Sequence, residues 1–364
     1  MAGFSPTGAL LLPAAATSIG LAWLAISWLI SPVLVARRRT RALHHTETTY
    51  IVPAVAEGDA GSTAPFDILQ AAPAKLLSVV VPAYNEVDRL PDMLDVTLAY
   101  LEAEASRNPA FTYEVLVVDD GSTDTTSKVA LDYSQRLGTD VLRVCTLRQN
   151  MGKGAAIREG MLRMRGRYAL MADADAAADI EDLGRLLAAT QQIQANGLGV
   201  GIGSRAHIEA ESVATRAWYR TIMMRVFHWC VVLLCSKRIR DTQCGFKLFT
   251  RQAAHVLFTT LHLERWAFDI ELVYLCERFG IPMVEVAVTW HEVPGSKLIT
   301  SKLDIITTSL TMLRDMLCVR VCYTAGIWKI CPTVMAAAAA AVAPAEVPDT
   351  APQQTKLASA SKQD

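Results

Sequence analysis

The sequence has almost no excess of charge of either sign. Its 364 residues include 35 Lys and Arg against 36 Asp and Glu, which gives a formal net charge of −1 at pH 7. Nucleic-acid-binding proteins usually carry a basic field that attracts the phosphate backbone. Because that field is absent here, we expect no nucleic-acid partner.

The eight cysteines form no C-x-x-C pair and no Cys/His array with the spacing of a zinc site. Most of them lie in apolar stretches, where cysteine acts as a small hydrophobic residue. This pattern indicates reduced, non-catalytic thiols in a reducing compartment.

Two glycine-rich stretches lack residues that the corresponding nucleotide-binding motifs need. Residues 150–154 (NMGKG) resemble part of a P-loop but have neither its earlier Gly nor its following Ser or Thr. Residues 199–204 (GVGIGS) have Ser where a dinucleotide fingerprint has its third Gly. The sequence therefore supports neither nucleoside triphosphate hydrolysis nor hydride transfer.

Charged residues are also absent from residues 9–36. At about 1.5 Å per residue, a helix of this length exceeds the roughly 30 Å of a bilayer core. Arginines follow directly at 37, 38, 39 and 41, whereas a secretory signal carries its charges before a shorter apolar region. The positive-inside rule then predicts a single uncleaved transmembrane anchor with the rest of the chain in the cytosol. A hydrophobic helix buried in the protein is the alternative.

Strand-like apolar runs alternate with helical patterns in the middle of the chain. The runs lie at 76–81, 115–118, 141–147 and 168–173, and amphipathic helices are expected at 87–106, 125–137 and 154–164. Further on we expect a strand at 198–203, a helical region at 215–234, a helix at 268–279 and an edge strand at 283–290. This alternation predicts an α/β fold with a doubly wound, mostly parallel, Rossmann-like sheet.

Residues 303–330 are apolar overall, but Asp304, Arg314, Asp315 and Arg320 interrupt them. Helices lying in the membrane interface fit this pattern better than a second span, which remains the alternative. The expected organisation is a tail at 1–8, an anchor at 9–36, a basic juxtamembrane segment and linker at 37–74, a catalytic domain at 75–299, interface helices at 300–333 and a disordered tail at 334–364.

Aspartates follow two of the expected strands, at Asp119, Asp120, Asp173 and Asp175. Ligands of open α/β sheets bind beyond the carboxyl ends of the strands. Four carboxylates gathered there repel one another unless a cation is present, and a divalent metal carrying a diphosphate meets that need. A single Asp after a strand is more often a helix cap or a turn residue.

The motifs in this region resemble the family 2 glycosyltransferases of GT-A fold. They are VVVPAYNE (79–86), VVDDGSTD (117–124), NMGKGAAIREG (150–160) and ADAD (172–175). In the second half, GSRAH (203–207), DTQCGFKLF (241–249), ERWAFDIEL (264–272) and GSKL (295–298) narrow the resemblance to the dolichyl-phosphate β-glucosyltransferase family. The resemblance covers residues 76–298 and implies transfer of glucose from UDP-glucose to dolichyl phosphate in the endoplasmic reticulum membrane, for assembly of the N-glycan precursor.

The resemblance also implies roles for individual residues. The donor would be bound by Pro82, Tyr84, Glu86, Asp119, Asp120 and Lys153. The catalytic residues would be Asp173, Asp175 and Asp241, of which Asp173 and Asp175 would hold Mg²⁺ or Mn²⁺ and Asp241 would act in positioning. The acceptor phosphate would be bound by Arg205, Arg220 and Lys297. Gln243, Phe246, Trp266 and Asp269 either shape the sugar pocket or belong to the core.

One position departs from the family pattern. The family often has Gly directly after the D-x-D pair, where this chain has Ala176. If that position requires a positive φ, alanine is unfavourable there, which puts the local turn in question but not the metal site.

Three other functions compete with this interpretation. The nearest is the same chemistry with GDP-mannose, which donor competition between UDP and GDP would distinguish. A membrane polysaccharide synthase would carry a Q-x-x-R-W element, of which only Arg265 and Trp266 are present. A non-catalytic nucleotide-sugar binder is the third, and the intact D-x-D and DDGSTD motifs argue against it.

Overall fold

A computed structural model describes residues 23–24, 26–35, 49–52, 62–66, 72–206, 229, 233, 239–293 and 302–329. Both expected tails, most of the expected anchor and nearly all of the helical region at 215–234 lie outside these ranges. Within the described ranges, no helix combines the length and the apolar character needed to cross a bilayer.

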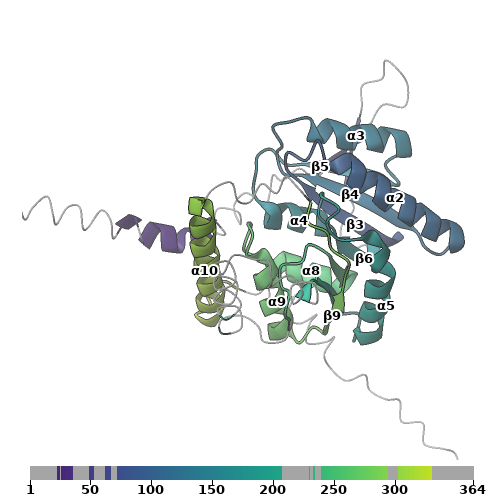
Figure 1. Cartoon of the computed structure of the whole chain (residues 1–364). Coiled ribbons are helices and arrows are strands. Elements are labelled where there is room, and N and C mark those ends of the chain that lie inside the picture. Colours follow the sequence, from purple (N-terminus) through teal and green to yellow (C-terminus); the bar gives the residue numbers. More distant parts are fainter. Residues whose placement is uncertain are drawn as a thin grey trace, which may run out of the picture.

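A seven-stranded sheet forms the centre of the molecule, with strand order β5-β4-β3-β6-β8-β7-β9 (Figure 1). Its strands are β3 (Lys75–Ala83), β4 (Tyr113–Asp119), β5 (Leu142–Thr146), β6 (Gly166–Met171), β7 (Val200–Ser204), β8 (Lys247–Thr250) and β9 (Met283–Ala287). Only β8 runs antiparallel to both of its neighbours. The predicted α/β fold with a mostly parallel sheet is therefore confirmed, and β9 lies at the edge as expected.

The predicted strands form where apolar and β-branched side chains run together. Residues 77–81 of β3 and 114–119 of β4 are fully buried, as expected for central strands of a parallel sheet covered on both faces. Strand β8 was not predicted, because its four residues directly follow a polar motif and carry a lysine.

Helices cover both faces of the sheet (Figure 1). One apolar core packs beneath α2 (Leu90–Arg107), α3 (Thr126–Leu137) and α5 (Leu183–Ile193), the last preceded by the short η1 (Ile180–Asp182). The other lies beneath α4 (Lys153–Met161), α8 (Arg251–Thr260) and α9 (Phe268–Phe279). Proline occupies the first turn of α2, where a missing amide hydrogen costs nothing.

A two-stranded antiparallel ribbon, β1 (Thr49–Val52) and β2 (Ser62–Pro65), lies within the segment interpreted as a linker. The guanidinium of Arg143 lies 5.4 Å from the ring of Tyr50 and 5.2 Å from that of Phe66. The ribbon region is therefore attached to the catalytic domain by ring–cation contacts that the composition of the segment did not indicate.

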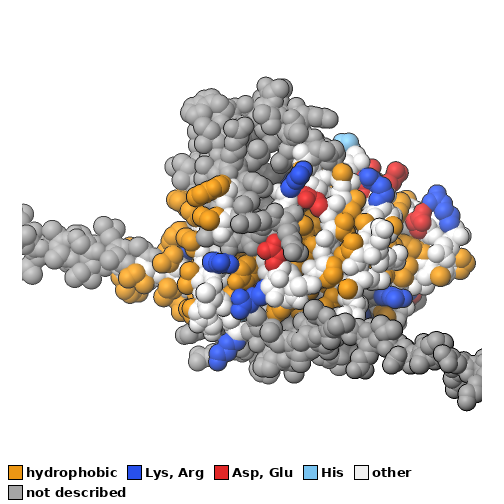
Figure 2. Space-filling view, turned by 90° about the horizontal axis from the view of Figure 1, so that it is seen from below, with side chains coloured by type: hydrophobic (Ala, Val, Ile, Leu, Met, Phe, Trp, Pro, Cys, Tyr) orange, Lys and Arg blue, Asp and Glu red, His pale blue; other side chains and the backbone are white. Residues whose placement is uncertain are grey.

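The C-terminal helix α10 (Lys302–Thr324) packs against the N-terminal helical segment at 26–35. Arg314 of α10 lies 5.0 Å from the ring of Trp28 and donates a 3.0 Å hydrogen bond to the Ser31 hydroxyl. Exposed hydrophobic side chains gather over both helices (Figure 2). They include Ile26, Leu29, Ile30, Leu34, Leu310, Leu317 and Val321.

Candidate active site

A cavity of about 580 Å³ opens beyond the carboxyl ends of β3, β4 and β6. Seven of the residues expected to bind the donor or the metal line it, namely Pro82, Tyr84, Glu86, Asp120, Lys153, Asp173 and Asp175. Arg89, Asn150, Gly152, Arg265 and Trp266 complete its polar and aromatic lining. The fold thus gathers residues of five motifs, which are distant from one another in the sequence, around one cavity.

The loop after β3 is held to the loop after β4 through Asn85. This residue has a positive φ of 54°, and its side-chain oxygen accepts a 2.8 Å hydrogen bond from the amide of Thr123. The amide of Asn85 donates to the Ser122 hydroxyl at 2.9 Å, and that of Glu86 to the Thr126 hydroxyl at 2.8 Å. These hydrogen bonds fix the loops after β3 and β4, which form two walls of the cavity, relative to each other.

The carboxylate of Asp120 holds the turn that precedes α4. It accepts hydrogen bonds from the amides of Met151 at 2.7 Å and Gly152 at 2.8 Å. Gly152 has a φ of +104°, and a Cβ there would lie 2.6 Å from the carbonyl oxygen of Glu264. Burial raises the pKa of Asp120 above its ordinary value, although the two amide donors oppose this effect.

Lys153 begins α4 and points its ammonium group at the D-x-D motif. Its Nζ lies 2.6 Å from Oδ1 of Asp173 and 5.8 Å from the ring centre of Trp266. Burial opposes the ammonium charge, but the carboxylates of Asp173 and Asp269 outweigh it and raise the pKa of Lys153. A fixed positive charge therefore lies at the floor of the cavity.

Asp175 lies on the other side of the same motif, within reach of Arg89. The Arg89 guanidinium forms a bidentate pair with Glu86, with two hydrogen bonds of 2.7 Å, and lies 3.9 Å from Oδ2 of Asp175. Oδ1 of Asp175 accepts a 3.1 Å bond from the amide of Ala177. Between them, Ala176 has a φ of 54°, so this position does require the positive φ that glycine would adopt more readily.

Asp119 is buried. It does not line the cavity, whereas Asp120, Asp173 and Asp175 do. Its carboxylate accepts hydrogen bonds from the amide of Ser122 at 3.0 Å and from the hydroxyl of Ser127. It therefore shapes the loop after β4. Adjacent aspartates on one strand end have different environments, which the sequence alone did not distinguish.

Arg205 and Asp241 form a bidentate ion pair apart from this cavity. The two hydrogen bonds measure 2.8 and 2.9 Å, and the Arg205 guanidinium lies 5.4 Å from the ring of Trp290. Burial opposes ionisation of Asp241, but Arg205 outweighs it and lowers the pKa of Asp241. The other two expected phosphate ligands, Arg220 and Lys297, lie outside the described residues.

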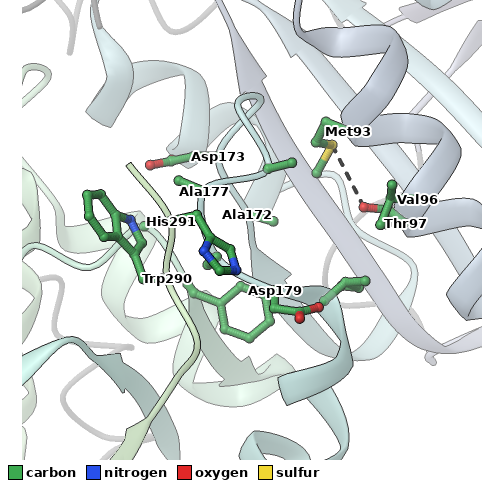
Figure 3. Close-up of a pocket in the computed structure, with 14 residues that line it drawn as sticks. Met93, Val96, Thr97, Ala172, Asp173, Ala177, Asp179, Trp290 and His291 are labelled. Atoms are coloured by element: carbon green, nitrogen blue, oxygen red, sulfur yellow. Dashed lines mark hydrogen bonds between the residues drawn. The ribbon is translucent and has the colours of Figure 1, made fainter. Parts of the chain in front are cut away.

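A second cavity of about 240 Å³ lies on the α2 side of the D-x-D turn (Figure 3). Asp173 lines both cavities, and the smaller one is also lined by Thr97, Trp290 and His291. Gly245 belongs to this wall, and a Cβ at Gly245 would overlap the Asp173 carboxylate. Because Gly245 has no side chain, the Asp173 carboxylate can occupy this space.

Several lining residues were not assigned a role from the sequence. Arg89 follows Glu86 by three residues at the start of a helix, and this spacing was the available signal. Arg265 lies in a loop, so it gave no periodic signal, and contacts with residues distant in the chain place this loop at the cavity. Asp269, left open between pocket and core, is buried and paired with Lys247 at 2.7 Å.

Two carboxylates suit a divalent cation bound together with a substrate. Within the described part of the chain, no group of three or more His, Cys, Asp or Glu residues could hold a metal ion. Mg²⁺ is usually bound by one or two carboxylates, with phosphate oxygens and water as its other ligands. Asp173 and Asp175 face the cavity with side chains 31% and 29% exposed, so this donor set fits such an ion.

Comparison with known proteins gives consistent matches. Residues 78–257 match the model of glycosyl transferase family 2. The chain is 52% identical over 260 residues to a dolichyl-phosphate β-glucosyltransferase of Homo sapiens, covering 71% of this chain and 79% of the relative. It is 49% identical over 289 residues to the Drosophila melanogaster protein of the same name, a match that covers 79% of this chain and 86% of the relative. It is 38% identical over 264 residues to the Saccharomyces cerevisiae protein of that name, a match that covers 70% of this chain and 76% of the relative.

A solved structure with a similar course of the chain is glucosyl-3-phosphoglycerate synthase from Mycobacterium tuberculosis in complex with UDP. It is 18% identical, with a TM-score of 0.43, and the match covers 66% of this chain and 81% of that chain.

Proposed function

The chain belongs to the dolichyl-phosphate β-glucosyltransferases of glycosyl transferase family 2, and we propose that it transfers glucose from UDP-glucose to dolichyl phosphate. The products are dolichyl β-D-glucosyl phosphate and UDP. The observation that carries this proposal is the gathering of five family motifs around one cavity of about 580 Å³.

The donor nucleotide binds between the loops after β3 and β4. Pro82, Tyr84 and Glu86 form one wall, and the Asp120 carboxylate the other. Carboxylates are pure hydrogen-bond acceptors when ionised, which suits the N3–H of uracil and the ribose hydroxyls. Asp119 contributes by shaping the loop that carries Asp120, since its own oxygens accept from Ser122 and Ser127.

The diphosphate lies over Lys153 and the D-x-D pair. Asp173 and Asp175 would hold Mg²⁺ or Mn²⁺ together with the phosphate oxygens. When bound, the ion supplies positive charge that stabilises the leaving diphosphate. Lys153 adds a compact cation of the chain itself, and its raised pKa keeps it charged at neutral pH.

Arg205 binds the acceptor phosphate, with Arg220 and Lys297 as further ligands. Arginine suits this role because its planar fork of donors matches phosphate oxygens. Asp241 positions Arg205 by accepting hydrogen bonds from two nitrogens of its guanidinium, and these bonds hold the Arg205 side chain beside Trp290. This arrangement supports a positioning role for Asp241.

The reaction is a single in-line displacement. An oxygen of dolichyl phosphate attacks the anomeric carbon while the bond to the UDP oxygen breaks, so the configuration inverts from α to β. A phosphate monoester has its second pKa at about 6, by analogy with phosphoserine, and is largely dianionic at neutral pH. No strong general base is therefore needed, unlike transfer to a sugar hydroxyl.

The enzyme works at the endoplasmic reticulum membrane with its catalytic domain in the cytosol. Residues 9–36 anchor the chain, and α10 lies in the membrane interface. The exposed hydrophobic side chains of the 26–35 segment and α10 support this arrangement. Removing residues 1–36 should weaken membrane association, and a truncated protein that remained fully membrane-bound would contradict the anchor.

Incubation of membranes containing the protein with labelled UDP-glucose and dolichyl phosphate tests the reaction. We expect label in a lipid product with β configuration, and inhibition by UDP but not by GDP. Label from GDP-mannose in that lipid would instead support the mannosyl chemistry. Binding of UDP-glucose without any turnover would contradict an enzymatic role.

A further inference from the structure

Glu271 of α9 is a buried carboxylate that the proposed mechanism does not use. Its side chain has no exposed surface. It accepts hydrogen bonds from the amides of His262 at 2.9 Å and Leu263 at 2.6 Å, and from the hydroxyl of Tyr323 at 2.7 Å. One carboxylate thus joins a loop before α9 to the C-terminal helix α10.

The loop held by Glu271 lies directly against the start of α4. The carbonyl oxygen of Glu264 accepts a 3.0 Å hydrogen bond from the amide of Ala155. Added Cβ atoms at Gly152 and Gly154 would lie 2.6 and 2.8 Å from carbonyl oxygens of this loop. The two segments are packed so closely that a shift of the loop also displaces the turn that carries Lys153.

The same loop continues into the wall of the donor cavity. Arg265 and Trp266 line that cavity, and the Lys153 ammonium lies 5.8 Å from the Trp266 ring. Two backbone amides held by Glu271 therefore precede, by two to four residues, two side chains that face the donor. Small displacements at such positions have large effects on binding because the contacts are short-ranged.

On its other side, Tyr323 belongs to a ring cluster beneath α10. Its ring packs against those of Tyr274, His262 and Trp328, with centroids 5.5, 5.6 and 5.3 Å away. Burial, and then the charge of Glu271, raises the pKa of Tyr323 well above its ordinary value, so its hydroxyl remains a donor. The outer face of α10 exposes hydrophobic side chains, including Val321.

We propose that Glu271 and Tyr323 are positioning residues of the donor site, which fix the Arg265–Trp266 wall by linking it to α10. This inference rests on the proposed function, because it assigns the wall to UDP-glucose. The residues act through the loop, so their loss should weaken donor binding and leave the acceptor site intact.

The test compares Tyr323→Phe with Tyr274→Phe in the full-length protein held in lipid nanodiscs. Both variants keep a buried ring of the same cluster, but only the first removes the hydroxyl that Glu271 accepts. We expect Tyr323→Phe to raise the KM for UDP-glucose roughly tenfold, the scale of a lost hydrogen bond to a charged group. The KM for dolichyl phosphate should match that of Tyr274→Phe. Loss of a buried hydrogen bond lowers the unfolding midpoint of Tyr323→Phe, so KM is measured at a temperature at which circular dichroism shows both variants to be folded.

Glu271→Gln gives a second measure, because it keeps the shape and one acceptor oxygen but loses the charge. Its KM for UDP-glucose should rise at least as much as that of Tyr323→Phe. Equal KM values for UDP-glucose in the wild type, Tyr323→Phe and Glu271→Gln would overturn the inference. A wild-type protein that transfers no glucose would instead contradict the proposed function, so the two failures are distinguishable.

Discussion

Two clusters of charged side chains lie at opposite ends of the same strands. At the start of β4, the fully buried Glu114 accepts hydrogen bonds from Arg143 at 2.8 and 3.0 Å, from Arg165 at 2.7 and 2.8 Å, and from Ser78 at 2.6 Å. Just beyond its end, Asp120 faces the donor cavity with two amide donors. One carboxylate lies at the start of β4 and the other directly after its end, and they differ in their surroundings.

The pKa shifts of the two carboxyl groups have opposite signs. For Glu114, burial opposes ionisation, but the two arginines outweigh it and lower the pKa. For Asp120, burial prevails and raises the pKa. The first cluster is compensated internally and needs nothing further, whereas the second holds negative charge that a bound ligand can use. A charge cluster thus indicates a binding site when it faces a cavity and its charge is incompletely paired.

The largest expected effect is on stability, at the compensated end. Glu114→Gln removes the negative charge that faces the fully buried guanidinium of Arg143, and we expect a loss of about 3–5 kcal/mol in the free energy of unfolding. Urea unfolding followed by circular dichroism measures it. The matched control is Glu104→Gln, whose partner Arg107 is largely exposed, and which should change stability by less than about 0.5 kcal/mol. Similar losses of unfolding free energy in both variants would contradict a stabilising role of the Glu114 cluster.

At the cavity end, the expected effect is on activity. Asp175→Asn removes charge from the metal-binding pair without changing its shape, and transfer should fall at least about a hundredfold. The urea midpoint should stay at the wild-type value, because the side chain is partly exposed and not part of a core. Full activity in this variant, or in the wild type with excess chelator, would remove Asp175 from the metal site.

Gly245→Ala tests whether the second cavity wall positions Asp173. The added Cβ would overlap the Asp173 carboxylate, so we expect transfer to fall roughly tenfold as that group is displaced. Gly184→Ala is the control, because the nearest atom to its added Cβ is the Tyr100 hydroxyl at 3.7 Å. Equal activity in the two variants would mean that Asp173 tolerates displacement.

The smallest effect is expected at Ala176, where φ is 54°. Glycine adopts this conformation without the steric cost that alanine carries, so Ala176→Gly should raise the free energy of unfolding by about 0.5–1 kcal/mol. Ala177→Gly, at a neighbouring position without positive φ, should lower stability instead because glycine adds freedom to the unfolded chain. A loss of stability in both variants would show that the turn is not strained.

Much of the fold followed from local patterns. Buried runs such as 115–118 predicted central strands, because β-branched side chains fit a pleated, covered surface. The aspartates at strand ends then indicated the rim, since parallel strands place their carboxyl ends together. Strand β8 was not predicted because it has only four residues and pairs with strands distant in the chain. The β1–β2 ribbon was not predicted because each of its strands has only four residues and lies in a segment with the composition of a linker.

The sequence by itself determined the alternation of strands and helices from β3 to β6, the motifs that meet at the rim, and the family to which the chain belongs. These depend on side-chain type and on spacing along the chain. Only the tertiary structure decided that Asp120 faces the cavity while Asp119 does not, that Asp241 engages Arg205, and that Glu271 joins a cavity loop to α10. Hydrogen bonds between residues far apart in the chain leave no local pattern, so packing alone assigns them.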